Sequence, residues 1–99
     1  MLTDLIDDMV TVPRNAEQRR EIMDATVREW APEERQKLSD DMSNLLTQRA
    51  VAVQTAALAA HERGEDVSAA SAELQILVDL TVCVKMAVRT LAKDDDSED

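Results

Sequence analysis

The sequence contains very few of the residues that make turns, aromatic cores and disulfide bonds. Its 99 residues include one glycine, two prolines, one cysteine and one aromatic side chain, Trp30. A β-sandwich or barrel needs many turns rich in glycine and proline, so this composition argues against both. A single glycine also excludes a glycine-rich phosphate-binding loop. The lone Cys83 excludes an intramolecular disulfide and a cysteine-rich metal site, and we expect it to be a small buried side chain.

Basic side chains are scarce as well, with 11 Lys and Arg against 21 Asp and Glu and a net charge of -10. Residues 1–12 carry -3 and residues 94–99 carry -5, so the chain between them carries only -2. Nucleic acid and anionic membranes both require a basic face, and we expect neither as a partner. The first ten residues lack the basic segment of a signal peptide, and no apolar run is long enough to span a membrane. We therefore expect a cytoplasmic protein.

Apolar residues make up 44% of the chain and, Trp30 and Cys83 apart, are all Leu, Ile, Val, Met or Ala. They recur at helical spacing, which predicts an all-α fold. Pro13 separates the first helix from the second, and Asn15 with Gln18 forms the pattern of a capping box. Pro32 suits the first turn of the third helix, and Gly64 suits its C-terminal end. The predicted helices cover about residues 4–11, 16–30, 32–63 and 67–93.

The two long helices, joined by the short segment GEDVS at residues 64–68, predict a long antiparallel helical hairpin. One or two shorter helices precede it, and residues 1–93 form a single helical domain. The acidic residues 94–99 are predicted to be a disordered tail.

The stretch LVDLTVCVKMAV, from Leu77 to Val88, alternates apolar and polar residues in the way a half-buried strand does. The alternation runs from Leu74 to Val88, which as a strand would be about 50 Å long, whereas strands usually have about 3–10 residues. No other segment of the chain could pair with it. We therefore assign it to a helix.

On a helical wheel, three apolar residues of this stretch lie on the side that carries the polar residues: Val78, Val82 and Met86. Either the N-terminal helices cover them, or a second copy of the chain does. A homodimer could bury them by forming a four-helix bundle from two hairpins, and an exposed apolar stripe would be a liability on a monomer. We therefore expect self-association through these three residues.

The polar residue that most needs an explanation is Arg49, which lies on the apolar stripe of the third helix. It could bind an anion or a substrate, or it could pair across the hairpin with Asp79 or Glu73. We favour the pair and expect Arg49 and Asp79 to be buried polar groups. His61, with Glu62 and Glu65 close to it, lacks the spacing of a metal site, and we expect no metal or cofactor.

Leu45, Leu46 and Arg49, followed by Glu73, make the segment from Leu38 to Leu74 resemble the all-α chorismate mutases. The resemblance implies a small helical dimer that binds a dicarboxylate through several Arg and Lys side chains. The lysine that the family carries about three turns after the Arg49 position is absent, because residues 56–60 are all apolar. A single cation cannot orient two carboxylates, so we expect no enzyme of this class.

These observations predict a small non-enzymatic interaction protein: a regulator, either an inhibitor, an anti-activator or an adaptor, that docks on a partner protein with a basic or apolar surface. An acidic mimic of nucleic acid that inhibits a DNA-binding protein is an alternative, although the middle of the chain is nearly neutral. The negative charge could instead serve solubility.

Overall fold

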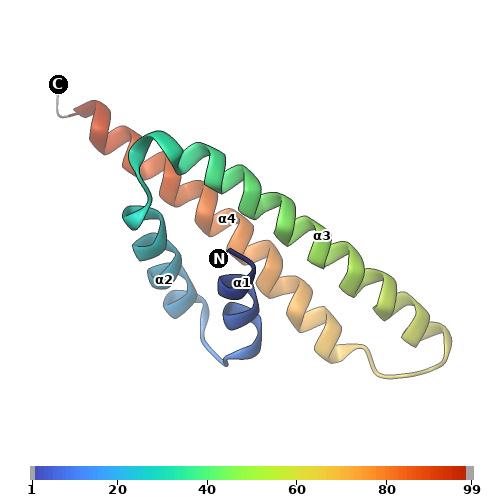
Figure 1. Cartoon of the computed structure of the whole chain (residues 1–99). Helices are drawn as coiled ribbons and strands as arrows, with labels where there is room; N and C mark the ends of the chain where they lie inside the picture. Colours follow the sequence, from blue (N-terminus) through green and yellow to red (C-terminus); the bar gives the residue numbers. More distant parts are fainter. Residues whose placement is uncertain (1, 98–99) are drawn as a thin grey trace.

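The computed structural model describes residues 2–97, with side chains described up to Lys93. This part of the chain is all-α, as the sequence predicts. Four α-helices follow one another: α1 (Leu2–Thr11), α2 (Ala16–Glu29), α3 (Arg35–Glu62) and α4 (Ser68–Ser97), with a short 3-10 turn, η1 (Pro32–Glu34), before α3. The long helices α3 and α4 form the predicted hairpin, and α1 and α2 pack beside it (Figure 1).

The start of α2 confirms the predicted capping box. The Asn15 side chain accepts a hydrogen bond from the Gln18 backbone N–H at 2.8 Å, and the Gln18 side chain accepts one from the Asn15 N–H at 3.0 Å. Two backbone donors that the helix leaves unpaired are satisfied in this way. Pro13 keeps α1 and α2 apart, so α2 can leave in a new direction.

The ends of the long helices differ from the predicted bounds. The third helix begins with the 3-10 turn η1, and Pro32 stands in its first turn, where a missing N–H costs no helical hydrogen bond. The fourth helix continues to Ser97, so residues 94–97 are helical where a disordered tail was expected. Neither glycine nor proline follows Lys93 to end the helix. Residues 98–99 lie outside the described part of the chain.

Gly64 and Asp66 shape the turn between α3 and α4, the first through its backbone conformation and the second through its side-chain hydrogen bonds. Gly64 has a φ of 77°, a left-handed conformation that glycine adopts without strain. Asp66 accepts hydrogen bonds from the Ser68 backbone N–H at 3.0 Å and from the Ser68 hydroxyl at 2.6 Å. These two bonds favour the carboxylate and lower the pKa of Asp66. The stabilisation they give is present above the unfolded pKa and is lost as the pH falls through the lowered one.

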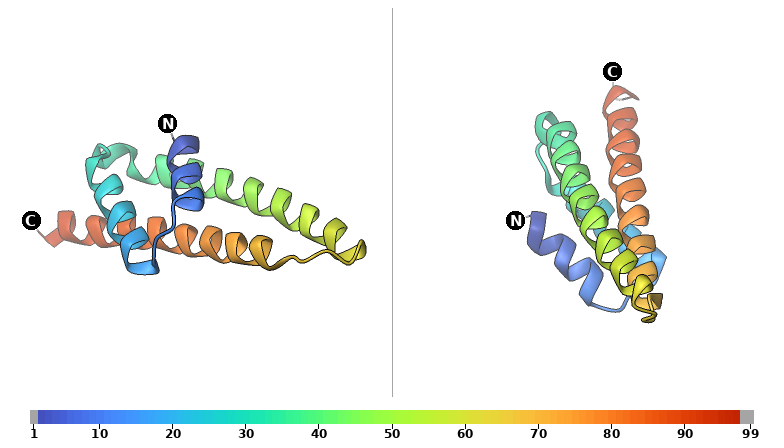
Figure 2. Two further views of the ribbon diagram at one scale, coloured as in Figure 1. Left: turned by 90° about the horizontal axis from the view of Figure 1, so that it is seen from below. Right: turned by 90° about the vertical axis from the view of Figure 1, so that its right-hand side faces the viewer.

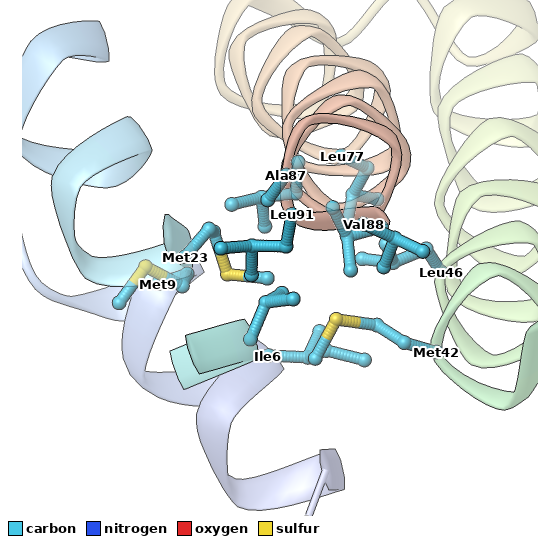
Figure 3. Packing of buried hydrophobic residues seen from close by; sticks show 12 residues of the cluster. Ile6, Met9, Met23, Met42, Leu46, Leu77, Ala87, Val88 and Leu91 are labelled. Atoms are coloured by element: carbon cyan, nitrogen blue, oxygen red, sulfur yellow. The ribbon is translucent and has the colours of Figure 1, made fainter. Parts of the chain in front are cut away.

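The core lies along one face of α4, which packs against each of the other three helices. Leu80 and Val84 of α4 are almost completely buried, and Met42 and Leu46 of α3 meet them from the hairpin side. Figure 3 shows side chains from all four helices pointing toward one another around α4. The methionines fill the irregular space that aromatic residues occupy in other cores, and the buried set is Ile6, Met9, Met23, Val27, Met42, Leu46, Leu77, Leu80, Val84, Ala87, Val88 and Leu91.

The turn end of the hairpin projects beyond α1 and α2, and we call residues 47–76 the hairpin arm. The projection is visible in Figures 1 and 2. None of the arm's residues is buried, whereas Leu46 and Leu77, which flank it, are. At its base, Ala50, Val53 and Ile76 are half-buried against the core. The molecule measures 58 × 23 × 20 Å, and its radius of gyration is 15.4 Å, against about 13 Å for a compact domain of this size. Among the described residues, no helix has a stretch long and apolar enough to cross a membrane.

Substitution of two leucines of α3 tests whether the stability of the fold comes only from the half of the hairpin that packs with α1 and α2. Leu46 is 1% exposed and Leu58 is 59% exposed. We expect Leu46→Ala to lower the free energy of unfolding by about 2–5 kcal/mol, because it leaves a cavity in the core. Leu58→Ala should change it by no more than about 0.5 kcal/mol. Urea unfolding followed by circular dichroism measures both values, and similar losses for the two variants would contradict this account of the core.

Candidate interaction surfaces

The structure leaves Val78, Val82 and Met86 of α4 uncovered, and we call these three residues the α4 strip. Val78 is 57% exposed, Val82 50% and Met86 61%. The N-terminal helices therefore do not bury the strip, which was one of the two possibilities raised by the sequence. Burial by a second copy stays a prediction. The strip is about 12 Å long, because eight residues separate its ends and an α-helix rises 1.5 Å per residue.

A groove of about 400 Å³ runs between α2 and α4 and includes part of the α4 strip in its lining. We call it the α2–α4 groove. Its lining includes Val82, Cys83 and Met86, and its charged residues are Arg20, Glu21, Asp24 and Asp79. One cation and three carboxylates give this lining a net charge of -2.

A second groove, of about 330 Å³, lies between α3 and α4, and we call it the α3–α4 groove. Its charged residues are Asp40, Lys85 and Arg89, which give a net charge of +1. Lys85 and Arg89 are exposed, and neither forms an ion pair with any residue between 2 and 93.

The hairpin arm carries a surface of a different kind. The segment AVAVQTAALAA, from Ala50 to Ala60, contains no charged residue, although charged residues make up 32% of the whole chain. Val51 is 57% exposed and Leu58 is 59% exposed. They are seven residues apart and therefore lie on the same side of α3. Sequence analysis assigned them no role, although the absence of charge in this segment could have indicated one.

Arg49 and Asp79 are each about one-third exposed, and each forms an ion pair, but not with each other. Arg49 pairs with Asp7 of α1 and lies 3.7 Å from a carboxylate oxygen of Glu73. The prediction that Arg49 pairs across the hairpin with Asp79 or Glu73 is met by Glu73, whereas the prediction that Arg49 and Asp79 are buried is wrong. Asp79 lies instead 3.5 Å from the Arg19 guanidinium of α2. These pairs fasten α1 to the hairpin and α2 to α4.

The ion pairs of Arg49 bear on the enzyme interpretation. Both acidic partners occupy the guanidinium that would have to bind a dicarboxylate. The environment of Arg49 thus agrees better with a structural role than with substrate binding.

His61 is exposed at the end of α3, and Glu65 pairs with Arg63. Between residues 2 and 93, no group of three or more potential metal ligands comes together.

Trp30 contributes to a groove of about 830 Å³ where α1, α2 and the start of α3 meet. Its other walls are formed by four leucines and four polar residues: Leu2, Leu5, Leu38, Leu45, Thr3, Thr26, Asp41 and Asn44. Sequence analysis did not single out this groove, because its walls come from three helices whose arrangement only the tertiary structure fixes.

Arg49→Met should loosen α1 without unfolding the hairpin, because it removes the pairs with Asp7 and Glu73. We expect the backbone amides of α1 to exchange with deuterium several-fold faster, while those around Leu80 keep their rate. Arg63→Met is the matched control, since it removes an exposed pair with Glu65 at the tip of the arm. Equal exchange rates in α1 for wild type and Arg49→Met would contradict the fastening role.

Cys83 should react slowly with thiol reagents. Burial raises the pKa of its thiol, the Asp79 carboxylate raises it further, and Arg20 and Arg19 act in the opposite direction. Asp79→Asn should therefore lower the pKa and increase the rate of modification at pH 8 several-fold. Asp40→Asn, on the other side of α4, is the control and should leave the rate unchanged. A rate that falls in Asp79→Asn would contradict this electrostatic account.

The chain matches no protein-family model, and comparison with curated proteins and with solved structures gives no significant match. We therefore infer its function from its own surfaces. The fold leaves uncovered the uncharged side of the hairpin arm, the α4 strip between its two grooves, and the groove beside Trp30.

Proposed function

We propose that the protein is a small non-enzymatic interaction module of the cytoplasm, a regulator or adaptor that docks on a partner protein through its hairpin arm. One observation supports this proposal above the others. The arm contains no buried residue, yet eleven successive positions of α3 within it carry no charge. Water-exposed surfaces normally have about a quarter to a third of their residues charged, so such a segment suits contact with protein.

The geometry of the arm fits a helix that lies in a groove of its partner. Val51 and Leu58 stand two turns apart on one side of α3, which is the spacing of anchor residues in helix-in-groove recognition. The small side chains beside them, Ala52, Thr55 and Ala59, are exposed and let a partner backbone approach closely. An apolar groove is therefore the complementary surface.

The tip of the arm adds a charge preference. Glu62, Glu65 and Asp66 are exposed there. Arg63 at the same tip pairs with Glu65 and so neutralises one of these three carboxylates. A partner whose groove ends in a basic rim would meet this negative tip favourably. Such complementarity raises the rate of association and is screened by salt.

Mimicry of nucleic acid is the weaker proposal. A mimic needs rows of free carboxylates, but many of the acidic side chains here are engaged with arginines. Those in ion pairs within residues 2–93 include Asp7, Asp8, Asp24, Glu65, Glu73 and Asp79.

Affinity capture from the native lysate tests whether a partner protein docks on the hairpin arm. The tagged wild-type chain should retain a partner protein that the variant Val51→Glu loses almost completely, because a buried, unpaired carboxylate is costly at an apolar contact. Val12→Glu is the control: Val12 is also an exposed valine, at 41%, but it lies between α1 and α2. Retention of the same partner by wild type and Val51→Glu alike would refute docking through the arm.

A further inference from the structure

A second inference concerns the groove of about 830 Å³ beside Trp30, which we call the Trp30 groove. Its lining ends at Leu45, before the hairpin arm begins, so it is a surface distinct from the one used in the proposed function. Pockets for small organic molecules have volumes of about 300–1,000 Å³ and walls that are mostly apolar, with a few polar groups. The Trp30 groove has this size and this kind of wall.

Three helices surround the groove, and the core fixes their side chains. Residues three, four or seven positions apart lie on one face of a helix. Leu2 and Leu5 of α1 form one such set, and Leu38, Asp41 and Leu45 of α3 form another, with Trp30 between the two helices in sequence. Leu2, Leu5, Trp30 and Leu45 also pack against the buried core. The groove is therefore a lasting feature of the fold.

Trp30 itself is held by the corner between α2 and α3. Its backbone N–H donates to the Val27 carbonyl at 3.1 Å, at the end of α2. Arg35 reaches back to the same end of α2, where its Nε donates to the Val27 carbonyl at 3.2 Å and its Nη2 to the Arg28 carbonyl at 3.3 Å. These bonds satisfy carbonyls that a helix end leaves without helical partners. A side chain that is held in place in this way loses little freedom when a ligand binds.

The charges of the groove favour a cationic ligand. Asp41 is the only charged residue in the lining that residues 2–93 provide; it is exposed and forms no ion pair with any of them. Lys37, one turn before it, lies outside the lining and does not pair with it. Trp30 is the only aromatic residue of the chain, and an indole ring attracts cations through its negative face. A carboxylate and an indole in one groove thus select the same sign of charge.

We infer that the Trp30 groove binds a small organic cation with an apolar tail. The tail lies against the leucines, and the cationic head lies beside the indole of Trp30 and the carboxylate of Asp41. A small molecule suits this site better than a protein segment does, because three helices enclose one concave space. The arm, by contrast, is a convex helical surface that suits the groove of another protein.

Three probes with the same eight-carbon tail test the charge preference: octyltrimethylammonium, octanoate and 1-octanol, each below the concentration at which it aggregates. Trp30 is the only tryptophan, so its fluorescence reports on this groove directly. Octyltrimethylammonium should change the emission saturably, with one molecule bound per chain. It should bind about tenfold or more tightly than the other two probes, because only its head is attracted to the carboxylate and the indole. Calorimetric titration provides a second measurement of the same affinities.

Asp41→Asn and Asp40→Asn are a matched pair of variants. Each removes one negative charge from an exposed position of α3, but Asp40 lines the α3–α4 groove instead. The general attraction of a chain of net charge -10 for cations is thus reduced equally in both. Asp41→Asn should weaken octyltrimethylammonium binding about fivefold or more and leave 1-octanol binding unchanged. Asp40→Asn should stay within about twofold of wild type.

Trp30→Leu tests the contribution of the indole while keeping an apolar wall. Calorimetry should show that the preference for octyltrimethylammonium over 1-octanol falls several-fold, because the attraction of the ring for the cation is lost. Circular dichroism checks that the variant keeps its helices.

Four results would overturn the inference: no saturable binding, equal affinity for the three probes, equal losses in Asp41→Asn and Asp40→Asn, or binding that weakens as the protein concentration rises. The last result would show that a second copy of the chain fills the groove. Failure here leaves the proposed function intact, because Val51 takes no part in the Trp30 groove. Conversely, Val51→Glu should bind octyltrimethylammonium as wild type does even where it loses its partner protein.

Discussion

The burial of one face of α4 is the interaction on which the rest of the structure depends. Every other helix packs against this face, and Leu80 and Val84 at its centre are almost completely removed from water. Burying apolar surface is the largest favourable contribution to folding, and a core without phenylalanine or tyrosine must obtain it from many aliphatic contacts. α4 supplies six of the twelve buried apolar residues, so the fold has one centre.

The lengths of the helices then decide which surfaces stay uncovered. α1 and α2 have 10 and 14 residues, whereas α3 and α4 have 28 and 30. Two short helices cannot cover two long ones, so the turn end of the hairpin projects as an arm and the outer face of α4 stays open. The short helices are held mainly by the side chains that they bury in this core, such as Met9 and Met23. The ion pairs of Arg19 with Asp79 and of Arg49 with Asp7 and Glu73 add to this, and their removal would loosen the short helices rather than unfold the core.

The two open surfaces differ in the charges that they carry. The arm carries eleven successive uncharged residues, seven of them exposed, and this suits an apolar groove of a different protein. The outer face of α4 carries an apolar strip with the cations Lys85 and Arg89 beside it, while the nearby carboxylates Asp24 and Asp79 are paired with arginines of α2.

Much of the fold was predictable from the sequence, because it depends on local rules. Helical periodicity, the Asn15 capping box, Pro32 and Gly64 fixed the number and order of the helices and the hairpin. The end of α4 was predicted too early, since a run of acidic residues does not by itself stop a helix. The wheel also identified Val78, Val82 and Met86 as surplus apolar residues, because it needs only the angle between successive residues.

What the sequence could not decide is which residues of different helices meet. Arg49 reaches Asp7 and Asp79 reaches Arg19, pairings that depend on the directions in which α1 and α2 leave the hairpin. Only the tertiary structure places Glu21 in one groove beside α4 and Lys85 in another, because the two grooves are formed by different helix pairs. The sequence by itself determined that this chain is a helical hairpin with apolar surface to spare, since periodicity is a property of each helix alone. The tertiary structure decided where that surface lies and which charges border it, since packing between helices is not encoded within any one of them.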